Sequence, residues 1–152
     1  MNKIFIILLM FGFAFSAVAQ SENPKYDKVL ADSLGGDDYG MRSYILVILK
    51  TGPTKIEDKK TSDSLFKGHM ENIGRLASIG KLIIAGPLGK NDNSYRGIFI
   101  LTVKTIEEAK ELLETDPTIK AKVFEVELYK WYGSAALPTY LPNHEKIEKK
   151  KM

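Results

Sequence analysis

The stretch SDSLFKGHMENIGRLASIGKLIIAGPLGKNDNSYRGIFILTV, residues 62–103, decides the fold because a helix pattern is followed in it by two strand patterns. Apolar residues recur at helical spacing along one face of residues 62–79, and Gly80 is a typical left-handed helix stop. The apolar segments 82–85 and 97–103 are too short for core helices, and the segment between them is rich in turn formers. We therefore predict a helix and then a hairpin with a long loop.

A strand and a loop are predicted before this stretch, and a second helix after it. Residues 43–49 have the composition of a buried strand, and the polar residues 50–61 that follow predict a long loop. Thr105 and Glu108 have the spacing of a capping box, which marks the start of an amphipathic helix. The Asp-Pro pair that begins at Asp116 ends this helix.

The last predicted strand, residues 123–131, alternates apolar side chains with Glu125 and Glu127. The order of elements is then strand, helix, strand, strand, helix, strand, the split βαβ or ferredoxin-like pattern of the α+β class. It predicts one antiparallel sheet with two helices on one face. Because apolar residues on the other face would form a large exposed patch, we expect a second subunit to cover it, and we predict a homodimer.

The N-terminus has the three parts of a secretory signal peptide, residues 1–19. Lys3 gives a positive start, residues 4–15 are apolar, and residues 17–19, Ala-Val-Ala, are the small residues of a cleavage site. The apolar run is shorter than the ~20 residues that a membrane-spanning helix needs. We therefore predict cleavage before Gln20 and an exported protein, periplasmic or secreted, with no membrane partner after cleavage.

The mature chain is predicted to be one domain that its core alone holds together, since it contains no cysteine for disulfides. The formal net charge is +3, and its excess lies in the signal peptide and the basic tail, residues 134–152. The body is therefore about neutral and lacks the basic surface typical of a nucleic-acid-binding protein. We expect residues 144–152 of the tail to be solvated and frayed. Residues 20–42 should be an extension with a short helix ended by Gly35.

His69 is the first candidate site residue because its place in the helix pattern directs it toward the sheet. It lies four residues after Leu65 and four before Ile73, both on the apolar face. A carboxylate beside a histidine fixes the ring tautomer, and the ring exchanges protons near neutral pH. Two simpler interpretations stay open: His69 as a hydrogen-bonded core residue, and Asp116 as the N-cap of a helix that begins with Pro117.

The hairpin loop has a weaker set of candidates for ligand binding: Asp92, Tyr95 and Arg96. The planar fork of the arginine could orient an anionic or hydroxylated ligand. The alternative is that the three residues belong to an exposed loop and bind no ligand. The two histidines, His69 and His144, are far apart and no cysteine accompanies them, so no metal site is predicted. A single histidine can be the proximal ligand of a haem, but no pattern in the sequence supports one, and no cofactor is predicted.

The chain also carries a series of short motifs in a fixed order: His69-Met70-Glu71-Asn72-Ile73, Gly80-Lys81-Leu82, Ala85-Gly86-Pro87-Leu88, Asp92, Arg96-Gly97, Glu107-Glu108-Ala109, Asp116-Pro117, Ala121 and Trp131. In this order and spacing they resemble the YCII-related (YciI-like) family over residues 43–131. The resemblance implies a ferredoxin-like, dimeric α/β barrel. It also implies an active-site dyad formed by His69 and Asp116. Thr118, Asn93 and Lys122 depart from the common pattern of the family.

Two functions remain open at this point. The first is an exported YCII-like domain, residues 43–133, that acts as a small-molecule enzyme and uses the His/Asp dyad for acid–base chemistry of the isomerase or lyase type. The second is a non-catalytic dimeric module of the cell envelope, with either a ligand-binding or a structural role. A reachable cavity beside His69 favours the first, and an enclosed, hydrogen-bonded histidine favours the second.

Overall fold

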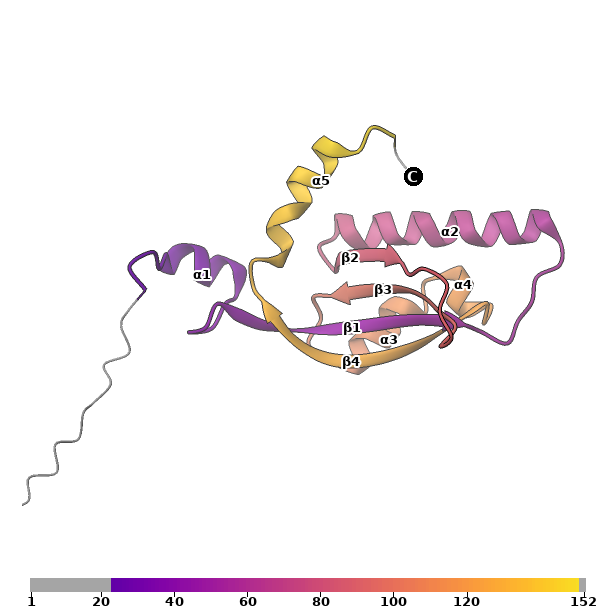
Figure 1. Cartoon of the computed structure of the whole chain (residues 1–152), viewed down its shortest axis with the longest axis horizontal. Helices are drawn as coiled ribbons and strands as arrows, with labels where there is room; N and C mark the ends of the chain where they lie inside the picture. The colour runs from indigo at the N-terminus through magenta and orange to yellow at the C-terminus, as the bar shows by residue number, and fades with distance from the viewer. Residues whose placement is uncertain (1–22, 151–152) are drawn as a thin grey trace, which may run out of the picture.

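The computed structural model describes residues 23–150, and the predicted signal peptide lies outside them (Figure 1). A short helix, α1, comes first, and the 3₁₀ helix η1 and the helix α5 come last. The elements are α1 Lys28–Leu34, β1 Met41–Thr51, α2 Lys59–Ser78, β2 Leu82–Pro87, β3 Tyr95–Leu101, α3 Ile106–Leu113, α4 Pro117–Lys120, β4 Phe124–Ser134, η1 Leu137–Tyr140 and α5 Leu141–Ile147.

The strands form one four-stranded antiparallel sheet in the order β2-β3-β1-β4. β1 is a central strand and pairs with β4 along its whole length, from Met41 opposite Ser134 to Thr51 opposite Phe124. This long pairing suits the large and β-branched apolar residues of β1. The predicted α+β class and the single antiparallel sheet are therefore confirmed. The predicted order of elements holds except that a short helix, α4, lies between α3 and β4.

One face of the sheet is covered by α2, α3 and α4, and the main core lies between the two layers (Figure 1). Side chains alternate along a strand, so Ile45, Val47 and Leu49 of β1 all face this core. Leu76 of α2 and Leu113 of α3 pack against them and are almost fully buried. Each such side chain stabilises the fold by ~1.5–3 kcal/mol relative to its exposure to water.

The other face of the sheet has a smaller core, which begins with Tyr44, Ile83 and Ile100. Leu137 of η1 and Leu141 of α5 pack against this cluster. Fraying was predicted for residues 144–152 of the tail, and it is wrong for the first of them, because α5 continues to Ile147. The apolar residues of η1 and α5 find a surface on the sheet, whereas the lysines after Ile147 carry most of the polar character that the sequence suggested.

The loop between β1 and α2 is shorter than predicted and spans residues 52–58. β1 continues to Thr51, and α2 begins at Lys59 because Asp58 caps it. The Asp58 carboxylate accepts hydrogen bonds from the Thr61 amide at 2.8 Å and from its hydroxyl at 2.5 Å. Among the described residues, no helix is both long and apolar enough to cross a bilayer.

Candidate active site

His69 lies on the face of α2 that packs against the sheet, as its spacing predicted. Its ring stacks on Phe99 of β3, with centroids 6.0 Å apart, and Phe66 and Phe124 approach it edge-on at 6.5 Å and 5.6 Å. The residue is 8% exposed. Aromatic side chains therefore surround most of the imidazole and leave only a small part of it open to solvent.

Asp116 is the N-cap of α4 and is completely buried. Its Oδ1 accepts a hydrogen bond from the Thr118 amide at 2.9 Å and another from the Thr118 hydroxyl at 2.6 Å. Pro117 takes the first helical position, where a missing amide proton costs nothing. The Asp-Pro sequence therefore has the capping role that its residue types favour, and this role uses only one carboxylate oxygen.

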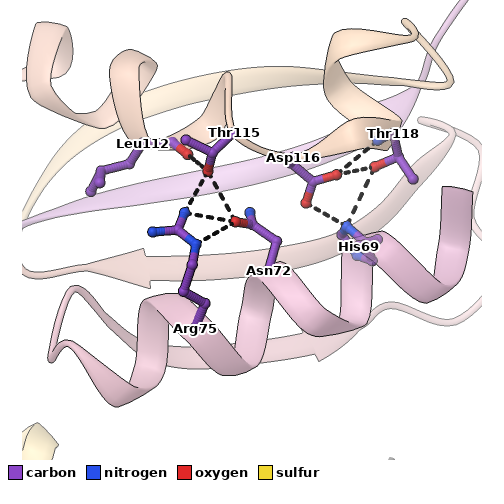
Figure 2. A network of polar contacts seen from close by, with 7 residues as sticks. All are labelled: His69, Asn72, Arg75, Leu112, Thr115, Asp116 and Thr118. Atoms are coloured by element: carbon purple, nitrogen blue, oxygen red, sulfur yellow. Dashed lines mark hydrogen bonds and ion pairs between the residues drawn. The ribbon is translucent and has the colours of Figure 1, made fainter.

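The second oxygen of Asp116 faces the histidine (Figure 2). His69 Nδ1 lies 2.6 Å from Asp116 Oδ2, and Thr118 Oγ1 lies 3.3 Å from the same nitrogen. Burial would raise the pKa of Asp116. The hydrogen bonds from His69 and Thr118 and the charge on His69 outweigh burial and lower the pKa of this carboxyl below its ordinary value. Asp116 is therefore an anion at neutral pH, and it accepts the Nδ1 proton.

The other ring nitrogen, His69 Nε2, has no hydrogen-bond partner within residues 23–150. No buried side-chain nitrogen or oxygen in this part of the chain lacks a partner. Nε2 is therefore in contact with solvent. A carboxylate on Nδ1 and an open Nε2 are the arrangement in which a histidine can take a proton from a ligand and return it.

The residues around this dyad also carry a family signature. The family model of the YCII-related domain matches residues 43–132, which is more than half of the chain. The chain belongs to the YCII-related domain family. A comparison with curated protein sequences finds no match.

Solved structures include one similar to this YCII-related domain, 5-chloro-2-hydroxyhydroquinone dehydrochlorinase from Burkholderia phenoliruptrix AC1100 in complex with 2,5-dihydroxybenzoquinone. The two chains are 22% identical, and the TM-score is 0.42. The matched region covers 58% of this chain and 92% of the dehydrochlorinase chain.

A glycine allows the two halves of the dyad to approach each other in this YCII-related domain. A Cβ atom on Gly68 of α2 would lie 2.8 Å from Pro117 Cγ of α4, closer than real side chains come. Gly68 precedes His69 and Pro117 follows Asp116, so the close contact lies directly beside the dyad. The only sequence signal for this contact was a glycine in the middle of a helix, which is unfavourable unless packing requires it.

Thr118 is the residue that the sequence reasoning missed. It is completely buried, and its hydroxyl and amide hold Asp116 Oδ1. The departure from the family pattern at this position therefore has a structural role beside the dyad. A threonine two residues after an N-cap aspartate is too common to indicate such a role by itself.

The three hairpin candidates lie around the start of β3, and none of them forms a hydrogen bond with His69. Arg96 Nε donates to Thr51 Oγ1 at 2.6 Å, and Asp92 is exposed in the loop. Tyr95 lies opposite Lys50 of β1, at a bulge in the β1–β3 pairing. Their binding of a ligand stays a prediction.

Two of the surface cavities in the described part of the chain are lined by no residue of the dyad. The larger, of about 480 Å³, is lined by residues that include Arg42, Lys104 and Tyr132. The smaller, of about 200 Å³, lies between α1 and the residues that follow β4. No group of three or more potential metal ligands occurs among residues 23–150.

Proposed function

We propose that this YCII-related domain is a small-molecule enzyme in which His69 transfers a proton through Nε2 while Asp116 orients the ring. One observation carries the proposal: the buried Asp116 carboxylate holds Nδ1 at 2.6 Å, and the opposite ring nitrogen has no protein partner among the described residues. A histidine with only a structural role would normally use both nitrogens or donate to a backbone carbonyl.

The chemistry follows from the tautomer that Asp116 selects. With the proton on Nδ1, the Nε2 lone pair accepts a proton from an acidic C–H of the ligand. The imidazolium that forms is stabilised by the adjacent Asp116 anion. Return of the proton to another ligand atom gives an isomerisation. If an anionic group leaves from the neighbouring carbon instead, the result is an elimination, and the proton passes to solvent.

Deuterium exchange tests this proposal without knowledge of the physiological substrate. Small molecules with an acidic C–H next to a carbonyl, such as 2-oxo acids and unsaturated lactones, are incubated with the protein in D₂O and followed by ¹H NMR. We expect at least one to lose its C–H signal with the wild-type protein. We expect His69→Gln to abolish this exchange. Asp116→Asn should reduce it by up to ~10⁴-fold, the effect of losing the carboxylate that orients a catalytic histidine.

His144→Gln is the matched control, because His144 is exposed on α5 and takes no part in the dyad. This variant should catalyse exchange of the ligand proton as fast as the wild type does. If no compound of the panel exchanges, or if His69→Gln exchanges as fast as His144→Gln, the enzyme proposal is refuted for this class of substrate.

We also propose that the domain is a homodimer, as expected for a dimeric α/β barrel. Support comes from the sheet face opposite α2, where Leu46, Ile48 and Ile98 are only partly buried and Tyr129 is 49% exposed. η1 and α5 cover only the end of this face near Tyr44. Light scattering should give twice the chain mass for the wild type. Ile48→Asp should give the mass of one chain with circular dichroism unchanged.

Export is the third part of the proposal. The positive start, apolar run and Ala-Val-Ala site of residues 1–19 support it. N-terminal sequencing of the protein from cells that express the whole chain should give Gln20 as the first residue. A mature protein that still begins with Met1 contradicts cleavage.

One observation favours the non-catalytic function that the sequence left open. Three phenylalanines surround the His69 ring, and neither of the two cavities described above includes it. In a ligand-binding or structural module, His69→Gln would lower the midpoint of thermal unfolding, and no compound of the panel would exchange its proton.

A further inference from the structure

A second group of polar contacts joins α2 to the segment before Asp116 (Figure 2). Asn72 is 7% exposed, and its Oδ1 accepts a hydrogen bond from Arg75 Nη2 at 2.8 Å. Thr115 Oγ1 lies 2.9 Å from this oxygen and 2.6 Å from the Leu112 carbonyl oxygen, and these two acceptors share its single proton. Arg75 Nη2 also donates to Thr115 Oγ1 at 2.7 Å. Each of the three side chains therefore contacts the other two, and together they join the helix to the loop.

This polar triangle, Asn72–Arg75–Thr115, lies directly beside the dyad. Asn72 follows His69 by three residues on α2, and side chains at this spacing share one face of a helix. Thr115 precedes Asp116, and consecutive Cα atoms are ~3.8 Å apart. A movement of Thr115 away from α2 would therefore carry Asp116 with it.

The guanidinium of Arg75 has no carboxylate within ion-pair distance in the described part of the chain. Arg75 lies in the last turn of α2, where the helix dipole favours a positive charge. Its donors point to Asn72 and Thr115, and its Nε adds a longer contact of 3.3 Å to Asn72 Oδ1. The arginine therefore serves here as a fork of hydrogen-bond donors.

The carboxylate of Asp116 depends on such support because only one of its two oxygens has a partner on α2. Oδ1 is held by the amide and hydroxyl of Thr118, both on the α4 side. Oδ2 has His69 Nδ1 as its partner, which belongs to α2. The contact between the two therefore depends on how closely the loop is held to α2.

We propose that Asn72, held by Arg75 and Thr115, is a positioning residue for the dyad. It fixes the loop at Thr115 and so keeps Asp116 Oδ2 directed at His69 Nδ1. Without this triangle Asp116 still caps α4, but Oδ2 loses the histidine and the ring samples both tautomers. The consequence for catalysis rests on the proposed function, whereas the contact itself exists in the free protein.

The test compares Thr115→Val with Thr115→Ser by NMR of the free protein. Valine keeps the shape of threonine and removes the hydroxyl, and serine keeps the hydroxyl. Long-range ¹H–¹⁵N spectra above neutral pH report the tautomer of His69, and exchange spectroscopy gives the solvent exchange rate of its Nδ1 proton. We expect this rate to rise about tenfold in Thr115→Val, the factor for one lost hydrogen bond, and to return to the wild-type value in Thr115→Ser.

Two further measurements separate positioning from a general loss of stability. Asn72→Leu removes the shared acceptor and should mix the His69 tautomers as Thr115→Val does. Amide exchange of Val47 in β1 reports the stability of the core and should change less than exchange of the His69 proton. The proposal is overturned if Thr115→Val keeps the wild-type tautomer of His69 and the wild-type exchange rate of its Nδ1 proton. It is also overturned if the exchange rates of the Val47 amide and of the His69 Nδ1 proton change by the same factor. Because no ligand is present, this result is independent of whether the protein is an enzyme.

Discussion

Replacement of Gly68 by alanine should separate the two groups of the dyad without changing either of them. The added Cβ would lie 2.8 Å from Pro117 Cγ, whereas ordinary van der Waals contact begins at 3.4 Å. α2 and α4 must therefore move apart by at least 0.6 Å, the difference between these two distances. Applied to the 2.6 Å contact of His69 Nδ1 with Asp116 Oδ2, this shift gives about 3.2 Å, the upper end of the N–H···O range.

The free-energy change has two opposing parts. Overpacking of a close contact costs ~1–3 kcal/mol, and alanine in a helix is more stable than glycine by ~0.5–1 kcal/mol. We therefore expect Gly68→Ala to lower the free energy of unfolding by up to ~2.5 kcal/mol. Gly74, in the same helix, is the matched control because a Cβ there meets nothing within 4 Å. Gly74→Ala should raise the free energy of unfolding by ~0.5–1 kcal/mol.

Urea unfolding measures both variants, and the difference between them isolates the contact with Pro117. Spectra of the His69 ring nitrogens then show whether the hydrogen bond to Asp116 has weakened. Gly68→Ala should increase the exchange rate of the Nδ1 proton, and Gly74→Ala should leave it unchanged. If Gly68→Ala is as stable as Gly74→Ala and keeps the wild-type histidine signals, the close approach of α2 and α4 does not support the dyad.

Three further predictions concern the acid sensitivity of the fold, one backbone strain and the tail. The pKa of Asp116 is lowered on folding, so its stabilising contribution is complete above the ordinary aspartate pKa of ~3.9 and is lost as the pH falls through the lower folded value. Urea unfolding of Asp116→Asn should therefore show less loss of stability below about pH 4 than the wild type, and lower stability at neutral pH. Lys122 has a φ of 56°, in the left-handed region, so Lys122→Gly should raise the free energy of unfolding by ~1 kcal/mol in the same assay. Leu141→Ala should lower it by ~1–2 kcal/mol, because Leu141 packs on the sheet while partly exposed.

Each of these predictions has a result that contradicts it. Parallel pH profiles for Asp116→Asn and the wild type would mean that the folded carboxyl titrates at its ordinary pKa. A less stable Lys122→Gly would show that the lysine side chain contributes more than its backbone strain costs. If Leu141→Ala has the same free energy of unfolding as the wild type, the tail does not stabilise the sheet.

The periodicity of apolar residues predicted the helices and strands because burial requires one apolar face per element. The same rule placed His69 correctly, since it shares a face with Leu65 and Ile73. The capping preferences of short polar side chains indicated where α3 and α4 begin, at the N-caps Thr105 and Asp116. The tail was predicted less well because its composition is dominated by polar residues and lysines. The few apolar residues of η1 and α5 that pack on the sheet form no clear pattern in the sequence.

Such local rules do not predict the contacts of the candidate site. His69 and Asp116 are 47 residues apart in the chain, and spacing alone could not give the 2.6 Å between their side chains. Thr118, Asn72 and Gly68 each have ordinary roles in a local sequence, and they gain a role at the site only because α2 and α4 lie together.

The sequence by itself determined the α+β class, the order of elements, the inward face of His69 and the cap at Asp116. These features depend on residue type and on spacings within a single element. The tertiary structure decided which oxygen of Asp116 meets the histidine, which ring nitrogen stays open, and which neighbours hold the pair. Those outcomes depend on distances between elements that are far apart in the chain, and packing of the whole core sets them.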